Sequence, residues 1–210
     1  MAIHNSYMIG ENWLRPGFAP EFQERSICQV CQTAETIDHI LTKCNANGQA
    51  HIWRLAQKLW FKKDKTNLAI SLGTILASPS IMVKGNKRKK NGANRLYRLI
   101  MSESAHLIWK LRCERVIQKE GAEIPSCKIE SRWMEIMNAR LDLDRKLANP
   151  KYEAKSLPIE LIQNTWKHTL RDEKLLPNNW VTYSGVLVGI DLREDDGRGR
   201  DRPPTPGLGA

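Results

Sequence analysis

Three cysteines and one histidine lie close together near the start of the chain. The segment CQVCQTAETIDHILTKC has the spacing C-x2-C-x7-H-x4-C, formed by Cys28, Cys31, His39 and Cys44. Two residues between the first two cysteines form a turn that lets both sulfurs grip one ion. ETIDHILTKC has the form of a short helix with His39 facing that turn. At about 100° per residue Cys44 lies roughly 140° further round, so we expect it at the frayed helix end.

This spacing predicts a small structural zinc module. Four protein ligands close a tetrahedron and leave no open position, whereas a catalytic zinc has three ligands and a water. The alternative is two unrelated buried cysteines and a surface histidine. If Zn²⁺ is bound, its binding free energy, of order 10–16 kcal/mol in small zinc modules, orders a segment that lacks a core of its own.

The composition is that of a globular chain. It has 210 residues, 41% of them hydrophobic and seven of them tryptophan, enough for one domain or a domain with a small module. The sequence contains no run of eighteen apolar residues, so it predicts no transmembrane helix. Its N-terminus lacks the pattern of a signal peptide. We therefore expect an intracellular, reducing setting, in which five cysteines are thiols or metal ligands.

The positive charge is concentrated in one region. The formal net charge is +10, and residues 84–115 hold ten Lys or Arg against two acids, a net +8. A local basic stripe favours a polyanionic partner such as RNA or DNA. The alternatives are a solvated loop and a nuclear import signal. The residues expected to contact phosphate are Lys84, Lys87, Arg88, Lys89, Lys90, Arg95 and Arg98.

Hydrophobic periodicity predicts a mainly α fold. Apolar residues recur at three- and four-residue spacing in segments 48–64, 93–121 and 126–147, and PIELIQNTWKHTLRDEKLLP (158–177) reads as a last helix. Residues 69–83 are a short helix or an irregular core segment. We expect the zinc module to pack on a bundle of about four helices.

The chain divides into three expected parts. Residues 1–50 hold a loop-rich lead-in and the zinc module, and residues 51–180 form the helical domain with a basic loop at 84–95. Residues 181–210 are an extended segment and a tail. The tail is predicted to be disordered because it consists of Gly, Pro and charged residues almost without apolar anchors.

No catalytic constellation is recognisable in the sequence. A two-metal nuclease needs several converging carboxylates, but Asp142 and Asp144 are two residues apart on a predicted helix and point in different directions. No phosphate-binding loop, dinucleotide fingerprint or nucleophile elbow is found. Cys113 and Cys127 are expected to be core thiols. The sequence therefore predicts a protein that is not an enzyme.

The Cys/His segment resembles the zinc-binding region near the C-terminus of non-LTR retrotransposon polyproteins. The segments IWRLAQKLW, RLYRLIMSESAHLIWKLRCERVI, RWMEIMNARLDLDRKL and LPNNWV are similar to the region that follows the reverse transcriptase and ribonuclease H modules in such elements of mushroom-type fungi. The resemblance covers about residues 5–190. It implies that Cys28, Cys31, His39 and Cys44 are zinc ligands, in a fragment that lacks the catalytic modules.

The function expected from residues and resemblance together is non-catalytic binding of RNA or DNA. Zinc would organise the module, and the basic residues 84–98 would contact phosphates. Two alternatives remain open. One is a structural module that docks onto an adjacent reverse transcriptase or ribonuclease H domain. The other is an inactive relic.

Overall fold

The computed structural model describes residues 7–46, 48–82, 87–118 and 123–190, and for residues 87–90 the course of the backbone alone. It is mainly helical, as the periodicity predicts. The expected disorder of the tail beyond residue 190 and the position of Lys84 lie outside the described residues. Within the described part, no helix is long and apolar enough to cross a membrane.

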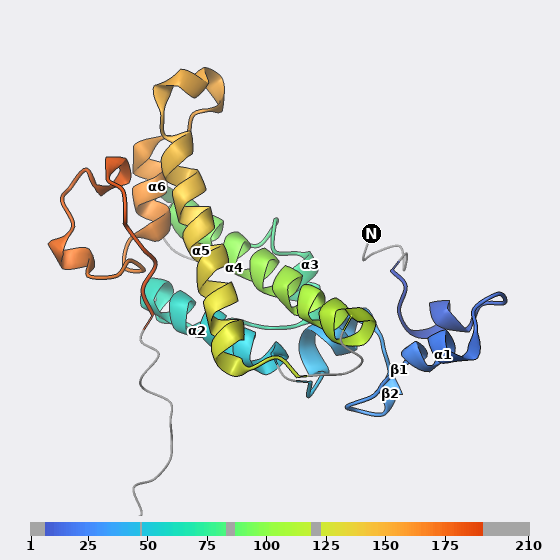
Figure 1. The fold of residues 1–210 in the computed structure, drawn as a ribbon. Helices are drawn as coiled ribbons and strands as arrows, with labels where there is room; N and C mark the ends of the chain where they lie inside the picture. The colour runs from blue at the N-terminus through green and yellow to red at the C-terminus, as the bar shows by residue number, and fades with distance from the viewer. Residues whose placement is uncertain (1–6, 47, 83–86, 119–122, 191–210) are drawn as a thin grey trace, which may run out of the picture.

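Four helices form the body of the molecule (Figure 1). They are α2 (Gln49–Asp64), α4 (Lys87–Cys113), α5 (Ser126–Leu147) and α6 (Ile159–Trp166). Helix α4 is central and packs against each of the other three. Two short α-helices, α1 (Pro20–Gln23) and α3 (Leu72–Leu76), one small hairpin and several short 3-10 and π-helical segments complete the described elements of the fold.

The core lies between these helices and is built on their apolar stripes. Its largest fully buried side chains are aromatic and aliphatic groups from all four helices: Trp133, Trp166, Ile52, Leu59, Leu96, Ile100, Met101, Ile129, Met137, Leu141 and Ile162. The two fully buried indoles of this set are hydrogen-bonded: Trp133 Nε1 donates to Ser104 Oγ over 3.0 Å, and Trp166 Nε1 donates to Asp144 Oδ2 over 2.8 Å. Burial of these aliphatic and aromatic groups, with both indole N–H groups satisfied, stabilises the bundle.

The hairpin and α1 stand at one end of the bundle, beside the C-terminal end of α4 (Figure 1). Strands β1 (Ile27–Cys28) and β2 (Thr33–Ala34) pair antiparallel, with Ile27 opposite Ala34 and Cys28 opposite Thr33. This end of the molecule carries the Cys/His segment.

Two expected boundaries differ from the structure. The last helix ends at Trp166, not near residue 177, because Leu170 forms an extended bridge with Val188 and leaves the helical path. The expected basic loop at 84–95 is helical from Lys87 onward, so its described residues are the first turns of α4. The first difference follows from pairing with a distant part of the chain, which overrides local propensity.

Candidate metal centre

The first two cysteines come from the hairpin. Cys28 ends β1, and Cys31 lies in the turn that leads to β2. The turn is closed by the Gln32 amide, which donates to the Cys28 carbonyl over 2.8 Å, with Gln32 in the left-handed region at φ 53°. This tight reversal points both sulfurs to the same side, as the two-residue spacing predicts.

The other two candidate ligands come from one π-helical turn, His39–Lys43. The Cys44 amide donates to the His39 carbonyl over 2.8 Å, an i+5 to i bond that places Cys44 one turn beyond His39. An α-helical turn would carry Cys44 roughly 140° round from His39. The wider turn reduces that offset, and Cys44 leaves the helix in an extended conformation. The sequence pattern predicted the helix end but not the π turn.

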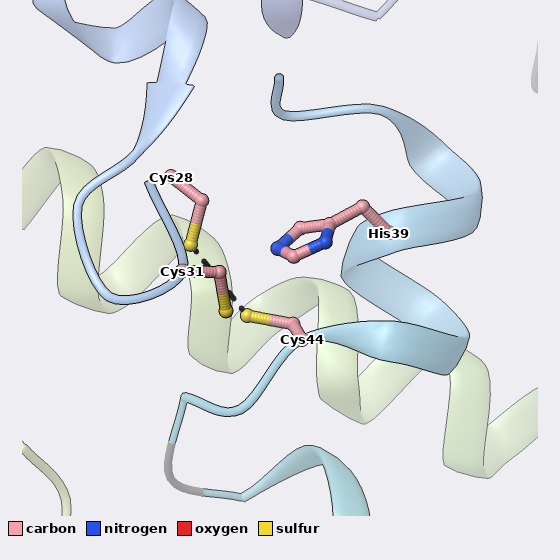
Figure 2. A group of neighbouring side chains, drawn as sticks. All are labelled: Cys28, Cys31, His39 and Cys44. Atoms are coloured by element: carbon pink, nitrogen blue, oxygen red, sulfur yellow. Dashed lines mark hydrogen bonds between the residues drawn. The ribbon is translucent and has the colours of Figure 1, made fainter. Parts of the chain in front are cut away.

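The four side chains converge on one point (Figure 2). The ligand atoms of Cys28, Cys31, His39 and Cys44 all lie within 4.8 Å of one another. The Sγ atoms of Cys28 and Cys44 are 3.7 Å apart, much longer than the ~2.05 Å of a disulfide bond. Cys28, His39 and Cys44 are buried. The group therefore can bind a metal ion.

The surroundings of the two ring nitrogens of His39 fit a metal-binding histidine. Nδ1 lies 3.4 Å from Thr33 Oγ1, while Nε2 is buried and makes no hydrogen bond of ordinary geometry with the described residues. Buried polar atoms are normally paired, so a buried nitrogen that faces three sulfurs indicates a missing partner. A hydroxyl near the other nitrogen orients the ring, as is usual for metal-binding histidines.

Backbone donors also point at the sulfurs. The amide of Asn45 lies 3.2 Å from Cys31 Sγ, and the amide of Ala46 lies 3.4 Å from Cys44 Sγ. Hydrogen bonds of this kind stabilise a thiolate more than a neutral thiol.

The thiols oppose one another's ionisation. Burial raises the pKa of the Cys44 thiol to about 12, and the nearby sulfurs of Cys28 and Cys31 add to the rise. Burial also opposes ionisation of Cys28, but the backbone donors at Cys31 and Val30 and the His39 ring outweigh it and lower its pKa to about 6. Three thiolates at this spacing repel each other unless a cation lies between them, which a divalent metal provides.

A buried ion pair attaches this centre to the bundle. Glu35 follows β2 and is 2% exposed, and it accepts from Arg112 of α4, whose Nε lies 3.0 Å from the carboxylate. Arg112 is itself 5% exposed. Its pKa is raised because the bonds to Glu35 outweigh the opposing effect of burial. No local sequence pattern marks this pair, because its two residues lie 77 positions apart.

The basic residues predicted to bind phosphate divide into two groups. Lys87, Arg88, Lys89 and Lys90 occupy the first turn of α4, and Arg98 is exposed further along the same helix. Arg95 is different, because its guanidinium forms a two-pronged ion pair with buried Asp144 of α5. The prediction that Arg95 contacts phosphate is therefore replaced by a structural role.

The remaining cysteines are also corrected. Cys113 is half-buried and Cys127 is exposed at the start of α5, so neither is the core thiol that the sequence indicated. Within the described residues, neither belongs to a metal-binding group.

The fold and site together define a helical protein with a compact cluster of three cysteines and one histidine that can bind a metal ion. Comparison with protein-family models, with curated proteins and with solved structures finds no match to this chain.

Proposed function

We propose that the metal is zinc and that its role is structural. A tetrahedral site with zinc–sulfur bonds of ~2.3 Å places two sulfurs about 3.7–3.8 Å apart. The Cys28 and Cys44 sulfurs are separated by 3.7 Å. With four protein ligands the ion has no open position for a substrate or an activated water.

The apolar packing around the centre supports a structural role. The buried apolar cluster here consists of Cys28, Cys44 and Ala46, with Cys31 packed against it. So small a cluster contributes little hydrophobic stabilisation, whereas a bound zinc supplies folding free energy directly. Zinc thus substitutes for a core at this end of the molecule.

The biochemical function that we propose is non-catalytic binding of RNA or DNA, and the start of α4 carries this proposal. Four consecutive cations, Lys87 to Lys90, stand at the positive end of a long helix dipole, with no acid in the first turn. Alone, this arrangement destabilises the helix, but with a bound phosphate the cations and the helix end both favour the anion.

The solvent-facing side of α4 extends this basic start. From Asn91 onward its exposed residues recur at seven- and four-residue spacing and include no acid: Asn91, Arg98, Ser102, His106 and Lys110. Such a surface suits the sequence-independent contacts that proteins make with a phosphate backbone. The proposal agrees with the resemblance to the region that follows the catalytic modules of a retrotransposon polyprotein.

A docking function is the second candidate. The metal-bearing end exposes large apolar side chains, with Leu14 55%, Val30 50% and Ile27 46% exposed. In the polyprotein context, an adjacent reverse transcriptase or ribonuclease H domain would cover them. A nuclear import role for Lys87 to Lys90 is compatible with either candidate.

The test combines metal analysis with binding. We expect about one zinc per chain under reducing conditions, and a lower free energy of unfolding after chelation. Wild type should bind a short labelled RNA or DNA with an affinity that falls steeply with salt. Changing Lys87, Arg88, Lys89 and Lys90 to Ala should weaken binding and flatten its dependence on salt, by about 0.7–0.9 in log–log slope per lost contact.

A control variant changes the same number of charges elsewhere. It replaces four exposed lysines on and just after α5, Lys128, Lys146, Lys151 and Lys155, with Ala. Binding that weakens equally in both variants would reflect net charge alone. Affinity that survives loss of the α4 cluster would contradict the proposed site.

A further inference from the structure

A second concentration of basic side chains surrounds a hollow at the far end of α2. The hollow has a volume of about 1020 Å³ and lies between the last turn of α2 and the segment that follows α6. Its lining includes Lys62, Lys63 and Lys65 from the end of α2 and His168 and Lys174 from the later segment. The two groups of residues are more than a hundred positions apart in sequence, so no local motif marks the hollow.

The hollow has an excess of positive charge. Four lysines line it against two acids, Asp172 and Glu173. The Glu173 carboxylate is engaged, because it accepts from the backbone amides of His168 over 2.8 Å and Leu170 over 3.3 Å. One of the two acids is thus held by the backbone of the loop.

The lysines also differ in their freedom. Lys62 donates to the Gly189 carbonyl, and Lys63 donates to the carbonyls of Asn164 and Lys167. Lys65 and Lys174, which line the hollow, are exposed, and so is Lys167, which directly precedes the lining residue His168. The first two lysines hold the walls together, and the exposed three remain accessible to a ligand.

The hollow adjoins the basic start of α4. Helix α4 crosses α6 so closely at Gly92 that a Cβ there would overlap the Asn164 carbonyl. The same carbonyl accepts from Lys63, which lines the hollow. Lys87 to Lys90 precede Gly92 by less than two helical turns, so the backbone that carries them begins close to the wall of the hollow.

We propose that the hollow and the start of α4 form one phosphate-binding surface, on which the backbone of a nucleic acid strand contacts Lys65, Lys167 and Lys174 as well as the α4 cluster. This inference rests on the proposed function and extends it to residues from the C-terminal half of the chain. The described residues that line the hollow include no Phe, Tyr or Trp, and the imidazole of His168 is their one aromatic ring. Four lysines accompany it, so the contacts that we infer there are mainly with phosphates, which carry no base preference.

The state of Lys63 agrees with an anion nearby. Burial lowers the pKa of this lysine to about 8, with Lys167 adding to the decrease and Glu173 and Asp64 opposing it. The site therefore holds a desolvated ammonium among other cations, which an added phosphate would stabilise.

The test uses the whole chain and two sets of substitutions. Lys65, Lys167 and Lys174 are changed together to Ala, and binding is measured by fluorescence anisotropy with a short labelled single-stranded RNA and the DNA of the same sequence. We expect an affinity loss of about tenfold or more and a log–log salt slope that is smaller by about 2, since three phosphate contacts are removed at ~0.7 each. A control with Lys128, Lys151 and Lys155 changed to Ala should retain the wild-type slope.

The outcomes separate this inference from the proposed function. If the hollow variant binds as wild type does while the α4 variant loses affinity, this inference is overturned and the proposed function stands. If neither variant loses affinity, both are overturned. Circular dichroism and metal content establish that the variants fold. If the Ala variant of the hollow does not fold, a variant with the same three lysines changed to Gln takes its place.

Discussion

Asp142 and Asp144, two aspartates of α5, differ in burial and in the partners of their carboxylates. Asp144 is 3% exposed and accepts from the Arg95 guanidinium and, over 2.8 Å, from Trp166 Nε1. Asp142 has a side chain 47% exposed and pairs with Lys146 at the surface. Asp144 thus joins three helices at one carboxylate, whereas Asp142 contributes a surface pair of little energetic value.

Asp144→Asn should therefore destabilise the protein strongly. The amide preserves size but removes the charge that satisfies Arg95 and places an N–H₂ donor where only an acceptor fits, at a cost of about 2–4 kcal/mol. Asp142→Asn, its matched control, should cost less than about 0.5 kcal/mol. Urea unfolding of the two variants measures the difference. Equal losses would show that the buried carboxylate is not a structural junction.

At the scale of whole elements, the contact between α4 and α6 depends on a missing side chain. Gly92 is buried, and its backbone approaches the backbone of Asn164 more closely than any Cβ allows. A glycine inside a helix is otherwise unfavourable by about 0.8–1 kcal/mol relative to alanine. Close packing at this crossing explains its presence in the longest described helix.

Gly92→Ala should consequently lower the free energy of unfolding by about 1–3 kcal/mol, because the two helices must separate to admit a methyl group. Gly73→Ala in α3 is the control, since a Cβ there would meet only Ser71 Oγ at 3.8 Å. That change should be neutral or slightly stabilising. Thermal unfolding of both variants tests this, and a Gly92→Ala protein as stable as wild type would refute the close crossing.

For the molecule as a whole, the end that carries the Cys/His cluster and the helical bundle are joined by a charged contact. The Glu35–Arg112 pair is buried on both sides and connects the residue after β2 to the long helix α4. Apolar contacts help, since Ile40 and Leu41 belong to the main core and Trp53 Nε1 donates to the Leu41 carbonyl over 2.7 Å. These contacts hold the segment that carries the Cys/His cluster against the bundle.

Replacing one partner of the Glu35–Arg112 pair should lower the free energy of unfolding more than replacing both partners. Arg112→Met leaves a buried carboxylate without a partner, and we expect a loss of about 3–5 kcal/mol. The double variant Glu35→Met/Arg112→Met should regain most of that loss because no charge remains buried. Denaturant unfolding of the zinc-loaded variants provides the measurement. A double variant no more stable than the single one would contradict this account.

Much of the fold could be read from local patterns. The start and end of α5 at Ser126 and Leu147 agree with its predicted bounds, and α2 was expected within one residue. The four candidate metal ligands were identified from spacing alone and converge in the structure. These features depend on residues within a few turns of one another, which is the range over which periodicity and short spacings act.

Other features were decided by contacts between distant residues. Arg95 lies in a basic stretch of the sequence that predicts phosphate contacts, yet its guanidinium forms an ion pair with Asp144, 49 positions away. The last helix stops at Trp166 because residue 170 pairs with residue 188. The lysines around the hollow come together only when α2 meets the segment after α6.

The sequence by itself therefore determined the four candidate metal ligands and the helical class of this protein. Only the tertiary structure decided which cations are free, how His39 and Cys44 share one π turn, and where the second basic surface lies. The physical reason is the range of the interactions. Helical periodicity and ligand spacing act along the chain, whereas burial and ion pairing depend on which remote segments the fold brings into contact.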